Sequence, residues 1–528
     1  MAGDAPPKFR GIFRQDDAAR AVYSEAAGIQ RILPKAVAVP KDVDDLLRLI
    51  EWARSAGITL VPRGSGSSMS GGAIGPGVVV DVSRWKGIAH DGDRIRAGPG
   101  VVCAEVNRVV SAAGMRFPVD PSSAPFCTIG GMTATNAAGA HSLAFGSMRD
   151  WVTAMRCVFA DGSTEWVSRD HAPGPANKRI ARQLANVGAG PGQPPRVRKN
   201  SSGYATSSYA ASRSLVDLLV GSEGTLALFA EIELRLTTVP AAVATVMGVF
   251  PSLDAATEAA IRATEAGVVT CELLDRTFLD FISAASGRPV ASTTEAILLS
   301  EIESDSPGAA EMAASLVAER FRRAGATETR LATSAAEQEV LWALRHAASP
   351  TLARLSARYR SMQFIEDGAV PPERLGDYVR GVRAALDRQE TRGVIFGHAG
   401  DAHVHVNPLV DVTLPDWRKR VDGLLDEVTA LVASLGGTLS GEHGDGRVRT
   451  PLLDRVWPEA ARREFGAIKT AFDPGSVFNA GVKVGSVPGI GTIKYDPALP
   501  PLPPDAARAL AEVESARGYD RFRLELLS

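Results

Sequence analysis

The sequence predicts an α+β fold spread over two or three domains. At 528 residues the chain is too long for one small hydrophobic core. Alternating helix and strand signals, separated by glycine-rich loops, continue to about residue 238. Short strands and amphipathic helices follow from about 240 to 430, which is typical of a second α+β unit.

The first region opens with the clearest helix, over residues 42–57. Apolar residues recur there at helical spacing, its first residue is an aspartate that can cap it, and its last is a glycine that ends it. Two short strands are predicted at 58–61 and 78–82, with a glycine–serine loop between them. A strand at 232–236 closes the region.

The later elements are fewer. Residues 419–435 predict a helix, because seven apolar residues fall on one stripe and two glycines follow. From about residue 486 prolines are frequent, which indicates an extended tail. A short helix is predicted within it at about 505–516.

Charge and cysteine usage exclude several classes of protein. A net charge of -2 leaves no basic excess for nucleic acid. The four cysteines stand far apart, so we expect neither an iron–sulfur cluster of the usual spacing nor a disulfide framework. We expect four buried free thiols instead. The N-terminus has no apolar signal core and no run of eighteen apolar residues occurs, so we expect a cytoplasmic protein, with peripheral contact at the inner membrane face left open.

The segment 397–407 carries the strongest chemical signal, since it holds three of the eight histidines. If its second half is a strand, His403, His405 and Asn407 share one face and the intervening valines point to a buried one. The later segment 441–444 adds a glutamate and another histidine.

These residues favour a metal site when they are taken together. Two histidines and a glutamate suffice for a catalytic metal with open positions, and His398, His405, Glu442 and His443 supply that set. Taken alone, His403 is better explained as a hydrogen-bonded core or surface residue.

A second motif, residues 62–72, is a loop of glycines and serines. Gly64 and Gly66 permit positive φ, so that successive backbone N–H groups can converge on an anion such as a pyrophosphate. Met69 in the third glycine position argues against a Rossmann fingerprint, and the lack of a Gly-Lys-Ser/Thr argues against a Walker loop. A flexible linker explains this loop equally well when it is taken alone.

Further glycine-rich segments favour a long cofactor lying against exposed backbone. Loops dense in glycine, serine and asparagine stand between short apolar strands. They span residues 120–131, 136–146, 199–204 and 221–226.

The order of these motifs resembles the flavoproteins of the vanillyl-alcohol-oxidase type, which have a PCMH-type FAD-binding domain. Within that superfamily the chain resembles the D-lactate and D-2-hydroxyglutarate dehydrogenases and the large subunit of glycolate oxidase. The resemblance extends from about residue 33 to Lys483. Its motifs lie at 63–72, 120–131, 221–225, 272–275, 398–407, 441–444 and 472–479.

The resemblance implies a domain order. It gives an N-terminal segment at 1–32, a PCMH-type FAD-binding domain of two α+β subdomains at 33–238, and a cap or substrate domain with an antiparallel sheet at 239–430. A helical C-terminal segment at 431–485 is expected to pack at the FAD and metal site. The proline-rich tail at 486–528 follows.

The resemblance also implies a cofactor site. We expect FAD, bound non-covalently because the glycine loop has no histidine for covalent attachment. The implied FAD-binding residues are Arg63, Gly64, Ser65, Gly66, Ser67, Ser68, Ser70, Gly71, Pro121, Ser122, Ser123, Gly130, Gly131, Asn136, Gly139, Ser142, Gly146, Glu223, Gly224 and Asn479.

The implied reaction is oxidation of a D-2-hydroxy acid, with D-lactate favoured over D-2-hydroxyglutarate and glycolate. A divalent metal, zinc by preference and otherwise iron or manganese, would be held by His398, His405 and Glu442. His443 is the candidate base because imidazole titrates near neutral pH. Arg345 would pair with the substrate carboxylate, although a helix-surface arginine fits it equally well.

Two departures from the family pattern concern the substrate and the electron acceptor. Phe364-Ile365-Glu366-Asp367 stands where relatives specific for 2-hydroxyglutarate place a lysine, which disfavours a dicarboxylate. The chain lacks the C-terminal iron–sulfur cysteines of many relatives, so a quinone, a cytochrome, an electron-transfer flavoprotein or a separate iron–sulfur subunit remain candidate acceptors. The sequence also leaves a homodimer possible. Two alternative functions stay open, namely a metal-free alcohol or lactone oxidase and a non-catalytic electron-transfer subunit.

Overall fold

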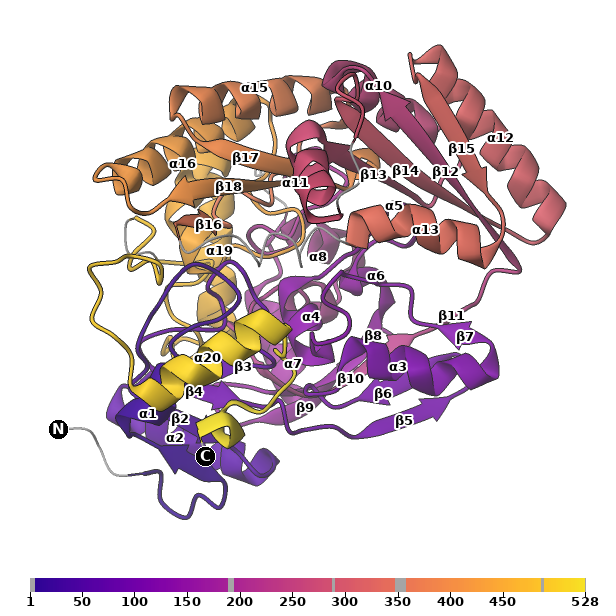
Figure 1. Cartoon of the computed structure of the whole chain (residues 1–528). Helices are drawn as coiled ribbons and strands as arrows, with labels where there is room; N and C mark the ends of the chain where they lie inside the picture. The colour runs from indigo at the N-terminus through magenta and orange to yellow at the C-terminus, as the bar shows by residue number, and fades with distance from the viewer. Residues whose placement is uncertain (1–4, 189–193, 287–289, 347–357, 486–488, 528) are drawn as a thin grey trace.

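The computed structural model describes residues 5–188, 194–286, 290–346, 358–485 and 489–527. Two sheets built from the first 240 residues lie against a seven-stranded sheet built from the residues that follow (Figure 1). The sheets and their covering helices confirm the predicted α+β class.

The first sheet has four strands in the order β1-β2-β4-β3. Strands β2, β4 and β3 are parallel to one another, and β1 is antiparallel to β2. It is made of β1 (Ile12–Arg14), β2 (Ala36–Val39), β3 (Leu60–Arg63) and β4 (Val78–Asp81), with helices α1 (Asp17–Val22) and α2 (Val43–Ala56). Asp42 caps α2 and Gly57 ends it at a φ of 62°, as the sequence predicts. Ile58 still bonds to Ala53 at the helix end, so β3 begins two residues later than predicted.

The second sheet is antiparallel, with the order β5-β6-β10-β8-β9. Its strands are β5 (Ile88–Asp91), β6 (Arg94–Ala97), β10 (Leu228–Arg235), β8 (Val152–Val158) and β9 (Thr164–Ser168), and β7 (Met115–Arg116) pairs separately with β11 (Thr237–Thr238). The helices of this unit are α3 (Cys103–Val110), α4 (Ile129–Thr135), α5 (Ser142–Phe145), α6 (Met148–Trp151), α7 (Pro175–Gln183), α8 (Thr206–Ser212) and α9 (Leu215–Leu219).

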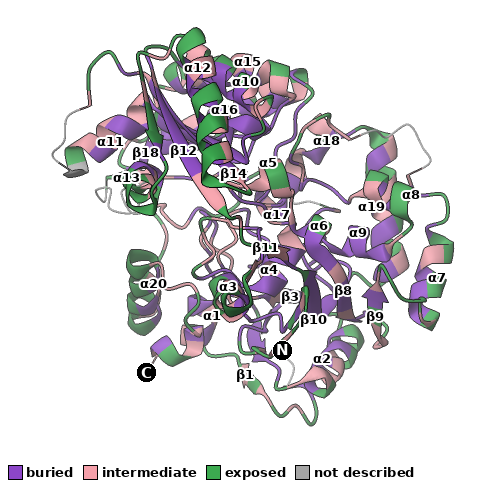
Figure 2. Ribbon diagram, turned by 90° about the vertical axis from the view of Figure 1, so that its right-hand side faces the viewer, coloured by how far each residue is buried: buried purple, intermediate pink, exposed green. Residues whose placement is uncertain are grey.

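The seven-stranded sheet is antiparallel throughout, in the order β15-β12-β14-β13-β17-β18-β16. Its strands are β12 (Ala242–Phe250), β13 (Thr270–Asp275), β14 (Ala296–Ser304), β15 (Glu328–Ala332), β16 (Tyr359–Ser361), β17 (Arg392–Gly397) and β18 (His405–Asp411). One face packs on α10 (Leu253–Thr264), α12 (Pro307–Arg323), α15 (Leu375–Arg388) and α16 (Trp417–Ser434). The other face packs on α11 (Arg276–Ser286) and α13 (Ala335–His346), and the central strands are buried in Figure 2.

The alternation of β18 places polar groups on the α13 side of this sheet. Val406 lies in the core under α15 and α16, so His405 and Asn407 point to the opposite face, as predicted. His403 departs from that arrangement. The strand starts only at His405, because Ala402 adopts a left-handed conformation at φ 53°, and His403 is fully buried before it.

The chain returns to the first unit after α16. Its short helices α17 (Gly446–Arg449) and α18 (Leu453–Val456) are followed by α19 (Glu459–Phe472), which packs into the core of the five-stranded sheet. The predicted tail helix is α20 (Pro504–Ala516), which packs on α1 (Figure 1). The start of the predicted tail, residues 486–488 with Pro488, lies outside the described residues.

Two simple sequence expectations concern cysteines and membrane spans. All four cysteines are free and buried, as expected. Within the described residues, no helix combines the length and the apolar character that crossing a bilayer requires.

His141 links the two units. Its Nδ1 lies 2.6 Å from Asp120 in the first unit, and its Nε2 lies 2.9 Å from Glu301 on β14. Burial disfavours the charged ring, but the carboxylates of Asp120 and Glu301 outweigh it and raise the pKa of His141 to about 11. The charged imidazole therefore bridges two carboxylates of different units.

This link makes stability depend on pH in one direction. Because the pKa is raised on folding, the stabilisation by His141 is complete below pH 6.5 and is lost as pH rises toward 11. We expect His141→Gln to lower the melting temperature at pH 6, and the gap to wild type to shrink steadily toward pH 10. His90→Gln, on the exposed strand β5, is the matched control. A gap that stays constant with pH would contradict this assignment.

Candidate functional site

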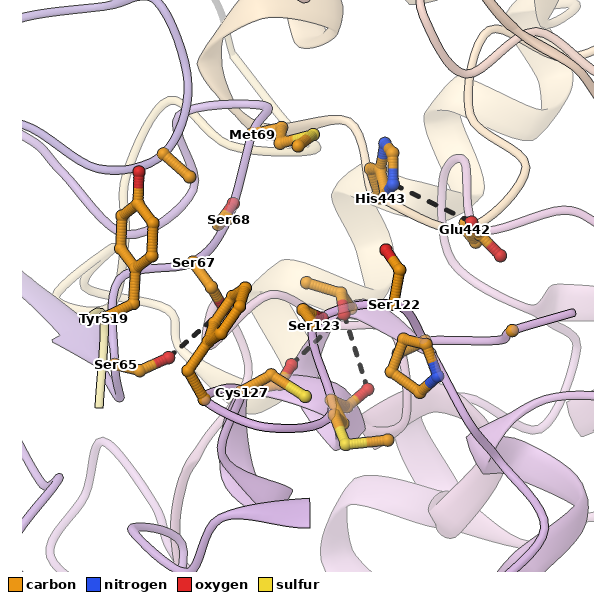
Figure 3. A pocket seen from close by; sticks show the side chains of 18 of the residues that line it. Ser65, Ser67, Ser68, Met69, Ser122, Ser123, Cys127, Glu442, His443 and Tyr519 are labelled. Atoms are coloured by element: carbon orange, nitrogen blue, oxygen red, sulfur yellow. Dashed lines mark hydrogen bonds and ion pairs between the residues drawn. The ribbon is translucent and has the colours of Figure 1, made fainter. Parts of the chain in front are cut away.

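A cavity of about 910 Å³ lies between the two units and holds both sequence motifs in its wall. The serines of the glycine loop lie on one side of it, and His443 and Glu442 lie on the other (Figure 3). The first unit supplies the loop, β18 supplies His405, and the residue after β17 is His398. Glu442 and His443 come from the connection between α16 and α17, so the site is complete only where these parts meet.

The glycine loop presents its backbone N–H groups without partners. Across the described parts of the chain, no backbone acceptor receives a hydrogen bond from the N–H groups of residues 65–71. The carbonyls of Gly66 and Ser68 instead accept hydrogen bonds from Ala27 and Gly28, which directs them away from the free N–H groups. The Ser68 hydroxyl is also buried without a hydrogen-bond partner. Free N–H and hydroxyl donors are what a diphosphate requires, so this loop fits FAD.

Most of the residues predicted to bind FAD line this cavity. They are Arg63, Gly64, Ser65, Gly66, Ser67, Ser68, Pro121, Ser122, Ser123, Gly130, Gly131, Gly139, Glu223 and Gly224. Six other predicted residues are not among the described residues that line the cavity. They are Ser70, Gly71, Asn136, Ser142, Gly146 and Asn479.

Two of these six residues, Asn479 and Ser70, brace the loops of the wall. The Asn479 amide donates to the carbonyls of Gly72 and Glu223, at 2.9 and 2.8 Å, and thereby ties the glycine loop to a second cavity loop. Ser70 Oγ donates to the carbonyl of His443 at 3.1 Å. These contacts fix the position of the wall, and they do not require contact with a ligand.

Glu442 is the centre of the histidine cluster. Its Oε1 lies 3.2 Å from His398 Nε2, 3.4 Å from His405 Nε2 and 3.8 Å from His443 Nε2. Its Oε2 accepts a hydrogen bond from Lys199 Nζ at 3.0 Å. The carboxylate is buried, but Lys199 and then His398 outweigh the burial and hold the pKa of Glu442 well below its usual range.

The outer nitrogens of two histidines are already engaged. His405 Nδ1 lies 3.0 Å from the carbonyl of Glu366, to which it can only donate, so Nε2 is the free acceptor of the neutral ring. His398 Nδ1 lies 2.5 Å from Glu272 Oε1, and this carboxylate raises the pKa of His398 to about 9 against the effect of burial. Both rings therefore direct Nε2 at Glu442, with the second partner that metal-binding histidines typically have.

The donor set suits a divalent cation. Ligand atoms of His405, Glu442 and His443 lie within 4.8 Å of one another, and so do those of His398, His403 and Glu442. Two imidazoles and a carboxylate are ligands that zinc, iron and manganese accept.

His443 is held by carboxylates. Its Nδ1 lies 3.2 Å from Glu366 Oε1, and its ring stacks on that of His405. Burial disfavours the imidazolium, but Asp367 and Glu366 outweigh it and raise the pKa of His443 to about 9. This shift runs opposite to the reason for which the sequence favours His443 as a base, while its role at the site stays a prediction.

Arg345 and Asn407 both line the cavity. Arg345 Nε donates to Glu272 Oε2 at 2.7 Å, and its guanidinium lies 5.0 Å from the centre of the Phe396 ring. The same Glu272 bonds to His398, so one buried carboxylate positions both the arginine and a histidine. The terminal amino groups of Arg345 remain as its other donors.

Sequence reasoning assigned no role at the site to four residues that stand in its motifs, namely Lys199, Glu272, Glu366 and Asp367. Asp367 accepts hydrogen bonds from His403 Nε2 at 2.9 Å, from Ser440 Oγ at 2.8 Å and from the His443 N–H at 2.9 Å. His403 is thus a hydrogen-bonded core residue, which is the interpretation that the sequence favours when His403 is considered by itself. Glu272 begins the motif at 272–275 and Lys199 begins the glycine-rich segment at 199–204, but neither pattern indicates which buried group its side chain contacts.

Comparison with known proteins identifies the family of the chain. Residues 34–168 match the FAD binding domain, and residues 239–482 match the C-terminal domain of FAD linked oxidases. The chain is 30% identical to D-lactate dehydrogenase of Archaeoglobus fulgidus over 84% of its length and 90% of that protein. It is 28% identical to glycolate oxidase subunit GlcD of Bacillus subtilis over 89% of its length and 93% of that protein.

A solved structure shares the fold. 4-Ethylphenol oxidase from Gulosibacter chungangensis superposes with a TM-score of 0.67 at 14% identity, over 91% of this chain and 94% of that one. Fold and cavity together define a flavoprotein with a PCMH-type FAD-binding unit. The chain belongs to the family of FAD-linked oxidoreductases that includes D-lactate dehydrogenase, D-2-hydroxyglutarate dehydrogenase and glycolate oxidase.

The hydrogen bonds of Asp367 predict a large effect on stability. Asp367→Asn removes a buried charge that faces Arg449 and His443, and it leaves those groups uncompensated. We expect a loss of about 3–5 kcal/mol in the free energy of unfolding, measured by urea denaturation. Asp377→Asn, in an exposed ion pair on α15, is the control and should change the free energy of unfolding far less, because solvent screens its charge. Equal effects of the two substitutions would show that Asp367 does not organise the site.

Proposed function

We propose that the protein oxidises a D-2-hydroxy acid, with D-lactate as the favoured substrate, to the 2-oxo acid. The observation that carries the proposal is a single cavity with a diphosphate-binding loop on one side and a histidine–carboxylate cluster on the other. The names of two relatives, D-lactate dehydrogenase and glycolate oxidase subunit GlcD, support the same class of substrate.

The reaction needs two protons and two electrons to leave the substrate. The hydroxyl loses a proton, the α-carbon loses a hydride, and a carbon–oxygen double bond forms. Bound FAD supplies the hydride acceptor at its N5 atom. The protein must therefore hold the α-carbon toward the flavin and accept the hydroxyl proton.

The donor atoms of His398, His405 and Glu442 fit a divalent metal, for which zinc is our first choice and iron or manganese the alternatives. When bound, the metal supplies a Lewis acid that lowers the pKa of a hydroxyl group. His398 and His405 contribute Nε2, because their Nδ1 atoms are engaged by Glu272 and by a backbone carbonyl.

His443 is the proposed proton acceptor. Its Nε2 faces Glu442, and its Nδ1 is held by Glu366 at 3.2 Å, so the ring has one nitrogen in the cavity and one fixed behind it. The ring can accept the hydroxyl proton only in its neutral form, and the carboxylates of Asp367 and Glu366 favour the charged form. A divalent cation held beside Glu442 would oppose that effect by charge repulsion and would favour the neutral ring.

Arg345 and Asn407 are proposed to orient the substrate. The terminal amino groups of Arg345 can pair with a carboxylate in a fork, while Nε keeps its bond to Glu272. Asn407 shares the cavity face of β18 with His405 and can hydrogen-bond the substrate. Phe364-Ile365-Glu366-Asp367 has no lysine where relatives specific for 2-hydroxyglutarate place one, which supports D-lactate over D-2-hydroxyglutarate.

The acceptor of the second half-reaction is proposed to be something other than oxygen. A quinone, a cytochrome, an electron-transfer flavoprotein or an iron–sulfur subunit would each serve, and an artificial acceptor can replace them in an assay.

Turnover with an artificial electron acceptor tests the proposal. We expect D-lactate to be oxidised faster than L-lactate, glycolate or D-2-hydroxyglutarate. His443→Asn should lower kcat by about 10²- to 10⁴-fold because the proton acceptor is lost, while the FAD content stays unchanged. His171→Asn, on an exposed turn, is the matched control.

Two outcomes would count against the proposal. Turnover of His443→Asn at the wild-type rate would remove His443 from the mechanism. Absence of activity with every D-2-hydroxy acid, in protein that contains FAD, would remove the substrate class.

A further inference from the structure

The C-terminal segment 489–527 forms part of the cofactor cavity. Tyr495, Glu514, Ser515, Arg517 and Tyr519 line it together with the glycine loop. The matches to the family's domains end at residue 482, so this part of the wall lies beyond them. Figure 3 places Tyr519 on the side of Ser65 and Ser67, across the cavity from His443.

The segment is fixed to the first unit by a core of its own. Ala506, Ala509 and Val513 of α20 pack in one apolar cluster with Val37 and Val61 of the four-stranded sheet. Farther on, Arg523 donates to the carbonyl of Ser65 at 3.2 Å. The tail therefore has a set position relative to the loop that fits a diphosphate.

Arg517 and Tyr519 meet at one ring of the cavity wall. The guanidinium of Arg517 lies 5.0 Å from the centre of the Phe126 ring, and the Tyr519 ring lies 5.4 Å from it at a tilt of 40°. Phe126 is itself a cavity residue. A cation and two aromatic faces at this position suit a phosphate next to a planar base.

Three arginines near the loop have N–H groups without a hydrogen-bond acceptor or have no ion-pair partner among the described residues. Among the described residues, no carboxylate lies within ion-pair distance of Arg517. Arg63 and Arg523 are buried, and each keeps N–H groups without an acceptor, at Nε and Nη2 of Arg63 and at Nε of Arg523. Burial lowers the pKa of all three arginines, so an anion in the cavity would be favourable.

The direction of the cofactor follows from the proposed function. The flavin ring must lie near His443 and Glu442 if the substrate is oxidised there. The ADP half then extends toward the glycine loop and Tyr519, on the other side of the cavity. We propose that the segment 489–527 is part of the FAD-binding site, in which Arg517 and Tyr519 contact the ADP half of the cofactor.

Binding measurements on the FAD-free protein test this inference without any turnover. We expect Arg517→Gln to raise the Kd for FAD about 10-fold, because one hydrogen bond to a charged group is lost. Competition by ADP should weaken by the same factor, since the contact is to that half. Tyr519→Ala should weaken both ligands as well. Arg521→Gln, an exposed arginine four residues away that pairs with Glu512, is the matched control and should leave both values unchanged.

The melting temperature of each FAD-free variant separates binding from folding. Equal melting temperatures with weaker FAD and ADP binding support the inference. The inference would be overturned if the Kd values were unchanged. It would also be overturned if binding weakened only in those variants whose melting temperature falls, and in proportion to that fall. Weaker FAD binding with unaltered ADP binding would overturn the assignment to the ADP half. None of these results depends on whether a hydroxy acid is the substrate. A failure of the proposed reaction can therefore be distinguished from a failure of this inference about FAD binding.

Discussion

The site depends on one buried carboxylate, that of Glu442, and on the groups that make its charge tolerable. An isolated buried carboxylate is costly, so its position is set by the partners that surround it. Lys199 reaches it from the first unit, and His398 and His405 reach it from the seven-stranded sheet. The backbone N–H of Glu442 is in turn held by Asp367 at 3.2 Å. Three segments that are distant from Glu442 in the sequence thus converge on one residue.

This convergence explains why the cavity lies at the junction of the two units. The glycine loop belongs to the connection between the parallel strands β3 and β4, whereas His405 and Asn407 belong to a strand of the antiparallel sheet. His141 and its two carboxylates hold these units together beside the cavity. The C-terminal segment then closes one side of the wall. A cofactor that spans the cavity would contact all three parts.

The sequence predicted those features that depend on local patterns. The helix at 42–57 has its capping aspartate and terminal glycine in the sequence itself, and the alternation of valines with His405 and Asn407 reflects strand geometry. Both were therefore correct. The predicted strand at 58–61 was displaced because Ile58 completes the helix end. The position of His403 outside the strand was not predicted, because it depends on the left-handed backbone conformation of Ala402. No local sequence pattern indicates that conformation.

The residues that sequence reasoning missed act through long-range contacts. Lys199 meets Glu442 across 243 positions, and Glu272 meets His398 across 126, so neither pairing can be inferred from spacing. The tail residues Arg517 and Tyr519 were missed for the same reason, since an apolar contact between α20 and α1 brings them to the cavity. Long-range pairs of charged groups are the part of this site that only the fold reveals.

The central claim is that a flavin and a cation-binding cluster act on one substrate in one cavity. An anaerobic titration of the purified protein with D-lactate, followed through the visible flavin band, tests it most directly. We expect D-lactate to bleach the band and L-lactate to leave it unchanged. We also expect bleaching to slow after removal of divalent metal and to recover when zinc is returned. A band that no D-2-hydroxy acid bleaches, or bleaching at an unaltered rate in metal-free protein, would contradict the account.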